Sequence, residues 1–196
     1  MILQVVREMV LAGREDEYRQ VEIETARACA EFGCPHPHLA LETVEGPMEV
    51  WWLNIFDSES HRQSITSAYA AHTELMRVLR ANSQRKAGLT SRPIDILAGY
   101  RADLSQHRGL VVAGVRFLVA AVDERSALSG GTLFDADDGT QLRLMAARSE
   151  TDVRMLVAET ASPLTVLEVQ PRWGVPAAEW IAADPEFWKV NPSAPR

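Results

Sequence analysis

Cysteine is scarce in this chain of 196 residues, which contains only Cys29 and Cys34. A small domain that replaces a hydrophobic core by disulfides needs several cysteines at regular spacings, so a disulfide scaffold is excluded. The hydrophobic content of 46% instead predicts that the chain buries a core of its own.

Long apolar runs and an excess of positive charge are also missing. No apolar segment has the length needed to cross a bilayer, and the first residues lack the charged and then apolar pattern of a signal peptide. Acidic residues outnumber basic ones by 27 to 20, for a net charge of −7. Because phosphates are repelled by such a surface, we expect no nucleic acid as a partner. The missing membrane span and signal peptide predict a cytoplasmic protein with no membrane partner.

The familiar catalytic loop motifs do not occur either. The chain has no Walker loop, no dinucleotide glycine fingerprint and no Gly-x-Ser-x-Gly elbow. The classes of nucleotide-binding protein and hydrolase that these motifs identify therefore have no support, and we expect no organic cofactor.

A bulky apolar run, residues 49–57, is the most informative stretch that the chain does contain. It is bounded by Gly46-Pro47 and by Asp57-Ser58, a pattern that is typical of a strand buried on both faces. Successive side chains of a strand point to opposite faces, so Trp51 and Trp52 must lie on opposite sides of the sheet.

The same alternation assigns the next residues of this run to faces. We expect Leu53 and Ile55 to face the helices and form the core. Trp52 and Asn54 would then face a cavity on the other side of the sheet.

Around this strand the pattern predicts an α+β fold. The first 105 residues have the order β-α-β-β-α-β, which is a ferredoxin-like antiparallel sheet. A break in the second helical region is expected at His72-Thr73, because Thr73 can cap a new segment. The expected strands are 2–10, 39–45, 48–56 and 94–101, and the expected helical regions are 14–32 and 58–87.

The second half predicts a smaller α+β domain with the order β-β-β-α-β. Asp137-Asp-Gly139 is a hairpin signal between two short strands, 132–135 and 141–147. Ser149-Glu-Thr-Asp152 resembles a capping box and starts a helix to about residue 160. We expect one domain over 1–105 and another over 106–196, the second being a degenerate repeat followed by a helical tail.

The first half resembles the dimeric α/β-barrel superfamily, which includes proteins similar to antibiotic-biosynthesis monooxygenases. The residues that carry the resemblance are Val5-Val-Arg-Glu8, Gly13-Arg-Glu-Asp-Glu-Tyr18, the segment 49–59 and the closing strand before Arg101. The resemblance implies two ferredoxin-like units that pair through their sheets and enclose a pocket. The partner unit would come from a homodimer or, as a pseudo-dimer, from the second half of the same chain.

This superfamily includes cofactor-free oxygenases, isomerases, haem-degrading enzymes and pure binders, so fold alone does not assign a function. The haem-degrading members place Asn on the first strand, Trp at the end of the third strand and His on the second helix. This chain has Gln4 or Arg7, Phe56 and Thr66 in those regions. Haem degradation is therefore poorly supported.

Asn54 and His72 are the candidate catalytic residues. An amide beside the indole of Trp52 can orient an aromatic substrate and stabilise a developing oxyanion, and His72 can move a proton. Arg7 or Arg101 can pair with an acidic group of a ligand. The simpler alternative is that Trp52, Asn54 and His72 are core residues with ordinary hydrogen-bond partners.

Cys34, His36 and His38 form a weak candidate for a metal site. Thiol and imidazole ligands at alternate positions suit zinc, and Cys29 is near enough in sequence to be a fourth ligand. The prolines between them impose a polyproline twist, which spreads these side chains apart.

These patterns together predict a protein that binds a small apolar or aromatic molecule. Cofactor-independent oxygenation or isomerisation is one alternative. A non-catalytic role in assembly or interaction is the other.

Overall fold

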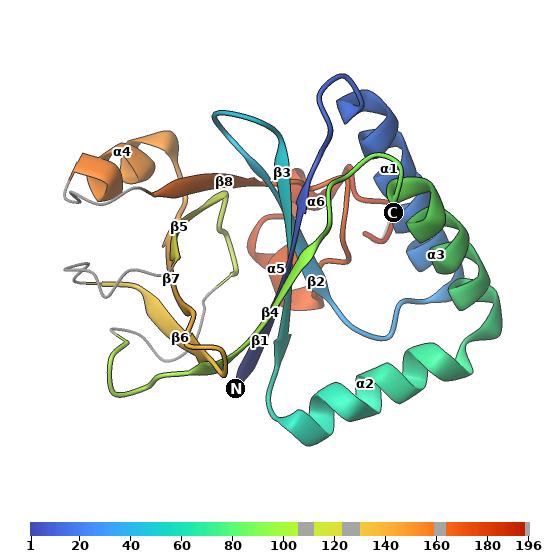
Figure 1. Ribbon diagram of the computed structural model, residues 1–196, viewed down its shortest axis with the longest axis horizontal. Helices are drawn as coiled ribbons and strands as arrows, with labels where there is room; N and C mark the ends of the chain where they lie inside the picture. Colours follow the sequence, from blue (N-terminus) through green and yellow to red (C-terminus); the bar gives the residue numbers. More distant parts are fainter. Residues whose placement is uncertain (106–111, 123–129, 159–163, 195–196) are drawn as a thin grey trace.

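The computed structural model describes residues 1–105, 112–122, 130–158 and 164–194. Eight strands form one closed antiparallel barrel with the order β1-β3-β2-β8-β5-β7-β6-β4, and the helices lie outside it (Figure 1). The fold is thus mixed α and β with an antiparallel sheet, as predicted.

The first half has the predicted order β-α-β-β-α-β. Gly33 ends α1 with a positive φ of 77°, which glycine adopts without a steric penalty. The break expected at His72 is confirmed, because α2 ends there and α3 begins. The elements are β1 (Ile2–Met9), α1 (Glu15–Phe32), β2 (His38–Thr43), β3 (Glu49–Phe56), α2 (Glu59–Ala71), α3 (Thr73–Lys86) and β4 (Ile94–Tyr100).

The second half continues the same barrel. Its predicted hairpin is confirmed by the antiparallel pairing of β6 with β7, and the predicted cap is confirmed by reciprocal hydrogen bonds between Ser149 and Asp152. The elements are β5 (Phe117–Val122), β6 (Thr132–Ala136), β7 (Gln141–Ala147), α4 (Glu150–Ala158), β8 (Thr165–Val169), α5 (Ala178–Ala183) and α6 (Pro185–Trp188).

The strand order of one half repeats in the other. The first half contributes β4-β1-β3-β2 and the second contributes β8-β5-β7-β6, so strands in corresponding positions follow each other in the same way. Antiparallel pairs of β2 with β8 and of β4 with β6 join the halves. One chain therefore supplies all strands of the closed barrel. The division into domains at 105 and 106 stays a prediction, and much of the predicted linker lies outside the described residues.

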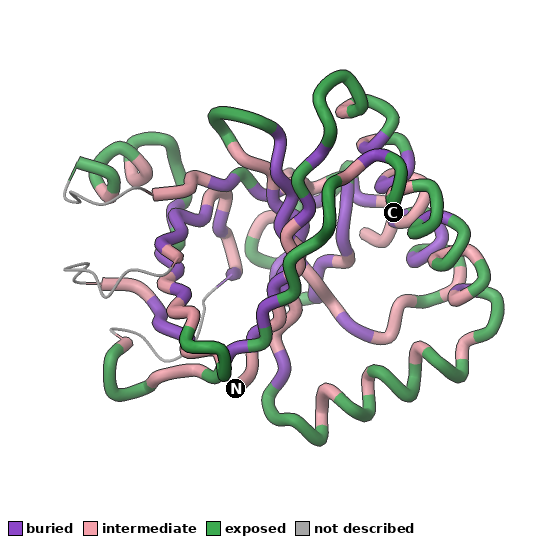
Figure 2. The backbone as a smooth tube through the Cα atoms, in the orientation of Figure 1, coloured by how far each residue is buried: buried purple, intermediate pink, exposed green. Residues whose placement is uncertain are grey.

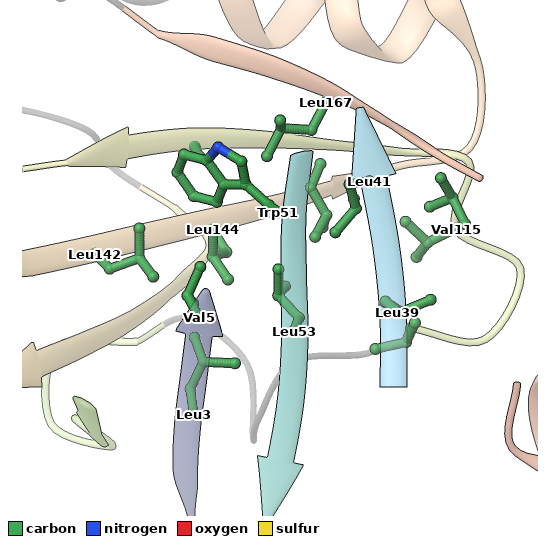
Figure 3. Close-up of a cluster of buried hydrophobic side chains, with 14 of the residues drawn as sticks. Leu3, Val5, Leu39, Leu41, Trp51, Leu53, Val115, Leu142, Leu144 and Leu167 are labelled. Carbon is green, nitrogen blue, oxygen red and sulfur yellow. The ribbon is translucent and has the colours of Figure 1, made fainter. Parts of the chain in front are cut away.

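The barrel interior is a packed apolar core (Figure 3). Trp51 and Leu53 project into it from β3, beside Leu3 and Val5 of the neighbouring β1. Side chains from the second half, such as Leu144 and Leu167, meet them there. Both halves thus bury their inner faces against each other.

The predicted assignment of faces on β3 is wrong. Leu53 is only 1% exposed and lies in the barrel interior with Trp51, whereas Trp52 packs with the cluster between sheet and helices. A strand that is buried on both faces carries no polar alternation, so its own sequence cannot tell which face is which.

The helices α1 and α3 pack against each other on the outer face of the first half (Figure 1). Tyr18 and Val21 of α1 pack against Val50 of β3, and Trp173 from beyond β8 joins them. The buried residues of α1 contrast with α2, which has none, as the burial colours show (Figure 2). Among the described residues, no helix combines the length and apolar character required to cross a membrane.

The segment after β8 returns across the start of β2. Val175 and His38 exchange backbone hydrogen bonds of 2.9 and 3.1 Å. Gly174 has a φ of 65°, and a Cβ there would approach the carbonyl oxygen of His38 to 2.7 Å, so the crossing requires glycine. Trp180 and Trp188 then pack against the barrel core, which attaches the C-terminal segment to the barrel.

Candidate functional site

A groove of about 610 Å³ lies between the β2–β3 hairpin and α4. Most of its lining is apolar, and it receives side chains from both halves of the chain. A volume of this size is typical of small-molecule sites, which range over roughly 300–1,000 Å³. The lining residues are Met9, Thr43, Val44, Glu45, Pro47, Glu49, Val153, Arg154, Val157, Ala158, Leu164, Thr165 and Val166.

Local hydrogen bonds shape both walls of this groove. On the hairpin, the Thr43 hydroxyl donates to the carbonyl of Pro47 and accepts the backbone N–H of Glu49, each at 3.0 Å. On the other wall, Ser149 caps α4, and Val153 and Val157 follow one turn apart on one face of that helix. The apolar walls are thus supported by regular structure.

Charged groups also line the groove. Glu49 accepts a hydrogen bond of 2.7 Å from Arg7 Nε, and the guanidinium of Arg7 lies over the ring of Trp51 at 4.6 Å. Among the described residues, no hydrogen bond or ion pair joins the side chain of Glu45 or Arg154 to a partner side chain. A largely apolar ligand could therefore place a polar group beside one of these two side chains.

The two arginines predicted to bind a ligand are paired within the chain. Arg7 is held by Glu49, which lines the groove, so Arg7 supports the site indirectly. Arg101 forms ion pairs with Asp103 and Asp135, and the hydrogen bonds that it donates to both carboxylates raise the pKa of its guanidinium. The role of each arginine toward a ligand stays a prediction.

Trp52 and Asn54 lie on the helix-facing side of β3 and are not part of the groove. Trp52 Nε1 donates a hydrogen bond of 3.0 Å to Glu8 Oε2, and the Tyr18 hydroxyl donates to the same oxygen at 2.6 Å. Asn54 is paired across the sheet with Gln4 and His38.

Glu8 belongs to a buried ionic cluster that the sequence analysis missed. Lys86 Nζ lies 3.2 Å from Glu8 Oε2 and 2.8 Å from Glu22 Oε1. Glu22 is only 1% exposed, and its contact with Lys86 has the distance of an ion pair without the geometry of a hydrogen bond. The contact is an ion pair, because two opposite charges this close attract at any angle. Tyr18 and Glu22, four residues apart on α1, were the available signal.

Burial governs the titration of this cluster. It raises the pKa of Glu22, an effect that the nearby positive charge of Lys86 opposes. Burial lowers the pKa of Lys86, but attraction to Glu22 and Glu8 outweighs it and the net shift is upward. The pKa of Tyr18 is raised, mainly by burial. The cluster thus joins α1 and α3 to the outer face of β1.

His72 lies at the junction of α2 and α3. Its Nε2 is 2.7 Å from the carbonyl oxygen of Phe32, and its ring meets the Phe32 ring edge-on. These contacts belong to the end of α1, whereas Asn54 lies opposite His38 on the sheet. The structure does not bring Asn54 and His72 together, so their proposed joint chemistry has no geometric support.

The three candidate metal ligands point to separate partners. Cys34 contacts Cys29 and Tyr69, His36 stacks on Phe56, and His38 is tilted against Trp52. Within the described part of the chain, no three His, Cys, Asp or Glu side chains gather in a way that could hold a metal ion.

Fold and groove together define the class of this protein as an α+β barrel. One chain supplies two sheets whose strands follow each other in the same order, and a largely apolar groove lies where the two halves meet. Two ferredoxin-like sheets that pair to close a barrel are the arrangement that the resemblance implied. In this chain the two sheets pair within one molecule.

No protein-family model matches this sequence, and no curated protein is significantly similar to it. Among solved structures, it is similar to an uncharacterised NIPSNAP domain protein from Burkholderia xenovorans, with 15% identity, a TM-score of 0.41 and coverage of 52% of this chain and 96% of that one. It is also similar to a "putative monooxygenase" from Lactobacillus acidophilus, with 7% identity, a TM-score of 0.48 and coverage of 86% and 93%. A "putative chlorite dismutase" shows 8% identity, a TM-score of 0.49 and coverage of 93% and 98%.

Proposed function

We propose that this protein binds a small, largely apolar molecule in the groove between the β2–β3 hairpin and α4. The observation that carries the proposal is the gathering of exposed apolar side chains in one concave place. Met9, Val44 and Val157 are 39%, 49% and 40% exposed, and all three line the groove. Exposed apolar surface that is concentrated in this way marks a binding site.

Binding is favoured over catalysis by the contacts of the candidate catalytic residues. Oxygenation or isomerisation was predicted from Asn54 and His72 in one cavity. His72 contacts the carbonyl oxygen and the ring of Phe32, and neither Asn54 nor His72 lines the groove. The groove offers Arg154 and Glu45 as polar side chains, which suits orientation of a ligand.

We also propose that the chain works as a monomer, a pseudo-dimer in which its second half replaces the partner subunit. Pairing of β2 with β8 and of β4 with β6 supports this, because it closes the barrel without a second chain. Light scattering of the purified protein should give the mass of one chain. The mass of a dimer would instead favour the predicted homodimer.

A fluorescent naphthalene sulfonate dye tests the binding proposal, because its apolar rings and single anionic group match the groove. We expect saturable binding of the dye, and displacement by some members of a panel of aromatic acids and phenols. Val157→Glu should weaken binding at least about tenfold, because it places a charge in the apolar wall, a loss of about 1.4 kcal/mol or more.

Met155→Glu is the matched control. Met155 lies on the same helix, is 55% exposed and does not line the groove. The Met155→Glu variant should bind the dye as the unchanged protein does. Both variants should keep an unfolding free energy within about 0.5 kcal/mol of that of the unchanged protein. Equal dye affinities of the two variants, or no saturable binding to the unchanged protein, would refute the proposal.

A further inference from the structure

The two cysteines of the chain meet at the end of α1. Cys29 lies in the last turn of the helix and Cys34 follows its end at Gly33. The Cys29 thiol donates a hydrogen bond to Cys34 Sγ, and the two sulfur atoms are 3.2 Å apart. A disulfide needs a separation of about 2.05 Å, so a shift of roughly 1 Å would join them.

A third group completes this arrangement. The hydroxyl of Tyr69, on α2, lies 2.8 Å from Cys34 Sγ. Cys34 thus has two hydrogen-bonding partners, and it is partly exposed, whereas Cys29 is only 4% exposed. The geometry divides the two cysteines into an outer thiol that can meet a reagent and an inner thiol that can reach only its neighbour.

Electrostatics give the same division. The pKa of Cys34 is lowered, first by the hydrogen bond from Cys29 and also by that of Tyr69. The pKa of Cys29 is raised by its hydrogen bond to Cys34 and by burial, and Glu22 adds to this effect. Because the thiolate is the nucleophile in exchange reactions, Cys34 is the residue that reacts first.

We propose that Cys29 and Cys34 form a reversible dithiol–disulfide site that reacts with low-molecular-weight disulfides. The thiolate of Cys34 attacks one sulfur of the small disulfide, a mixed disulfide forms, and the first small thiolate leaves. The sulfur of Cys29 then loses its proton to solvent and attacks Cys34 Sγ, and the second small thiolate leaves. The cysteines lose two electrons and two protons, and the small disulfide becomes two thiols.

In this scheme Tyr69 is a positioning residue for the Cys34 thiolate. Its hydroxyl donates to the sulfur when that sulfur is charged, and so favours the reactive form. The site is independent of the groove, which neither cysteine lines.

Oxidised glutathione serves as the probe for the full-length protein. Intact-mass measurement of the reduced protein after incubation should show the loss of two hydrogen atoms, with both thiols protected from alkylation. Subsequent treatment with reduced glutathione in excess should restore both thiols. Retention of two free thiols in the oxidised buffer would overturn the proposal, and this result depends on no variant.

Cysteine variants test the order of the steps. Cys29→Ser should stop at the mixed disulfide and gain the mass of one glutathione on Cys34. Cys34→Ser should react at least about tenfold more slowly, because the remaining thiol is buried and its thiolate is disfavoured. A Cys34→Ser variant that reacts as fast as Cys29→Ser would contradict the division of roles.

Tyr69→Phe should move the midpoint of the rate–pH profile of Cys34 to higher pH. Ser67→Ala on the same helix is the matched control, because the Ser67 hydroxyl donates to the carbonyl of Gln63, one turn earlier on α2. It should leave the profile unchanged. Identical profiles for Tyr69→Phe and the control would remove Tyr69 from the site.

Discussion

The outer faces of the two halves differ much more than their inner faces. In the first half, α1 and α3 cover the sheet and enclose the buried charges of Glu8, Glu22 and Lys86. In the second half, α4 is the helix that packs on β5 and β7, and Val119, Ala121 and Met145 form a smaller cluster beneath it. Figure 1 shows α1 and α3 on one side of the barrel and α4 on the opposite side.

The comparison shows how the chain separates folding from binding. The inner faces are alike because each must bury apolar side chains against the other to close the barrel. The outer faces are free of that constraint. The more heavily covered one holds a charged cluster whose members need specific partners. The groove lies beside the less covered one, where Val157 of α4 meets Met9 and Val44 of the first half.

Lys86→Met, in the more heavily covered half, should cause the largest loss of stability among the variants considered. It leaves Glu8 and Glu22 buried beside each other without a positive charge, which costs about 3–5 kcal/mol of unfolding free energy. The loss should be smaller at low pH. The pKa of Glu22 is already raised, so stability falls as pH rises through it, and protonation relieves the repulsion.

Chemical denaturation at pH 5 and pH 8 measures this effect. Arg77→Met is the control, because Arg77 pairs with Glu74 on the exposed side of α3. That variant should lose less than about 0.5 kcal/mol. A similarly small loss for Lys86→Met would mean that the buried cluster does not hold α3 on the sheet.

Val50→Ala and Val119→Ala compare the outer faces directly. Both side chains are 0% exposed and lie on central strands, Val50 in the larger cluster under α1 and Val119 in the smaller cluster under α4. We expect losses of about 2 kcal/mol for Val50→Ala and about 1 kcal/mol for Val119→Ala, because a less covered site relaxes more easily around a cavity. Denaturant midpoints at constant slope measure both values. The reverse order would contradict this view of the second half.

His38 should make the first half sensitive to acid. Burial lowers its pKa to about 4 from an ordinary value of 6.5, and the charges of His36 and Lys86 add to the shift. The unfolded chain therefore binds more protons between these values, so stability is lost as pH falls from 6.5 toward 4. His38→Gln should flatten this decline by an amount on the order of 1 kcal/mol, reduced by partial exposure.

Thermal unfolding of the two proteins across this pH range measures the difference in slope. Equal slopes would show that His38 is not the group that titrates. Carboxylates add to the pH dependence of stability at lower pH. One of them is Glu59, whose pKa is lowered to about 2 by its hydrogen bond from Arg62.

The elements of the fold were predictable because their signals are local. The helical spacing of α1, its stop at Gly33 and the turn at Asp137-Asp-Gly139 each depend on residues near in sequence. The repeated strand order was partly predictable, since the second half shows the same succession of strands without the first helix.

The candidate site was not predictable, because its parts come from distant segments. Glu49 and Val157 lie in different halves of the chain and line one groove only when β2 pairs with β8. The ionic cluster likewise joins β1, α1 and α3. The prediction that Trp51 and Trp52 lie on opposite faces of the sheet is confirmed. The prediction of which face lines the barrel interior is wrong.

By itself, the sequence determined the strands, the helices and the opposition of the two indoles, because backbone geometry and side-chain periodicity act over a few residues. The tertiary structure alone decided that Trp51 faces the barrel interior, that Trp52 meets Glu8, and that two thiols and a phenol converge. The surroundings of the two indoles depend on the pairing of strands far apart in the chain, and that pairing is decided by the joint burial of both inner faces. The meeting of the thiols with the phenol depends on where α2 lies against the end of α1.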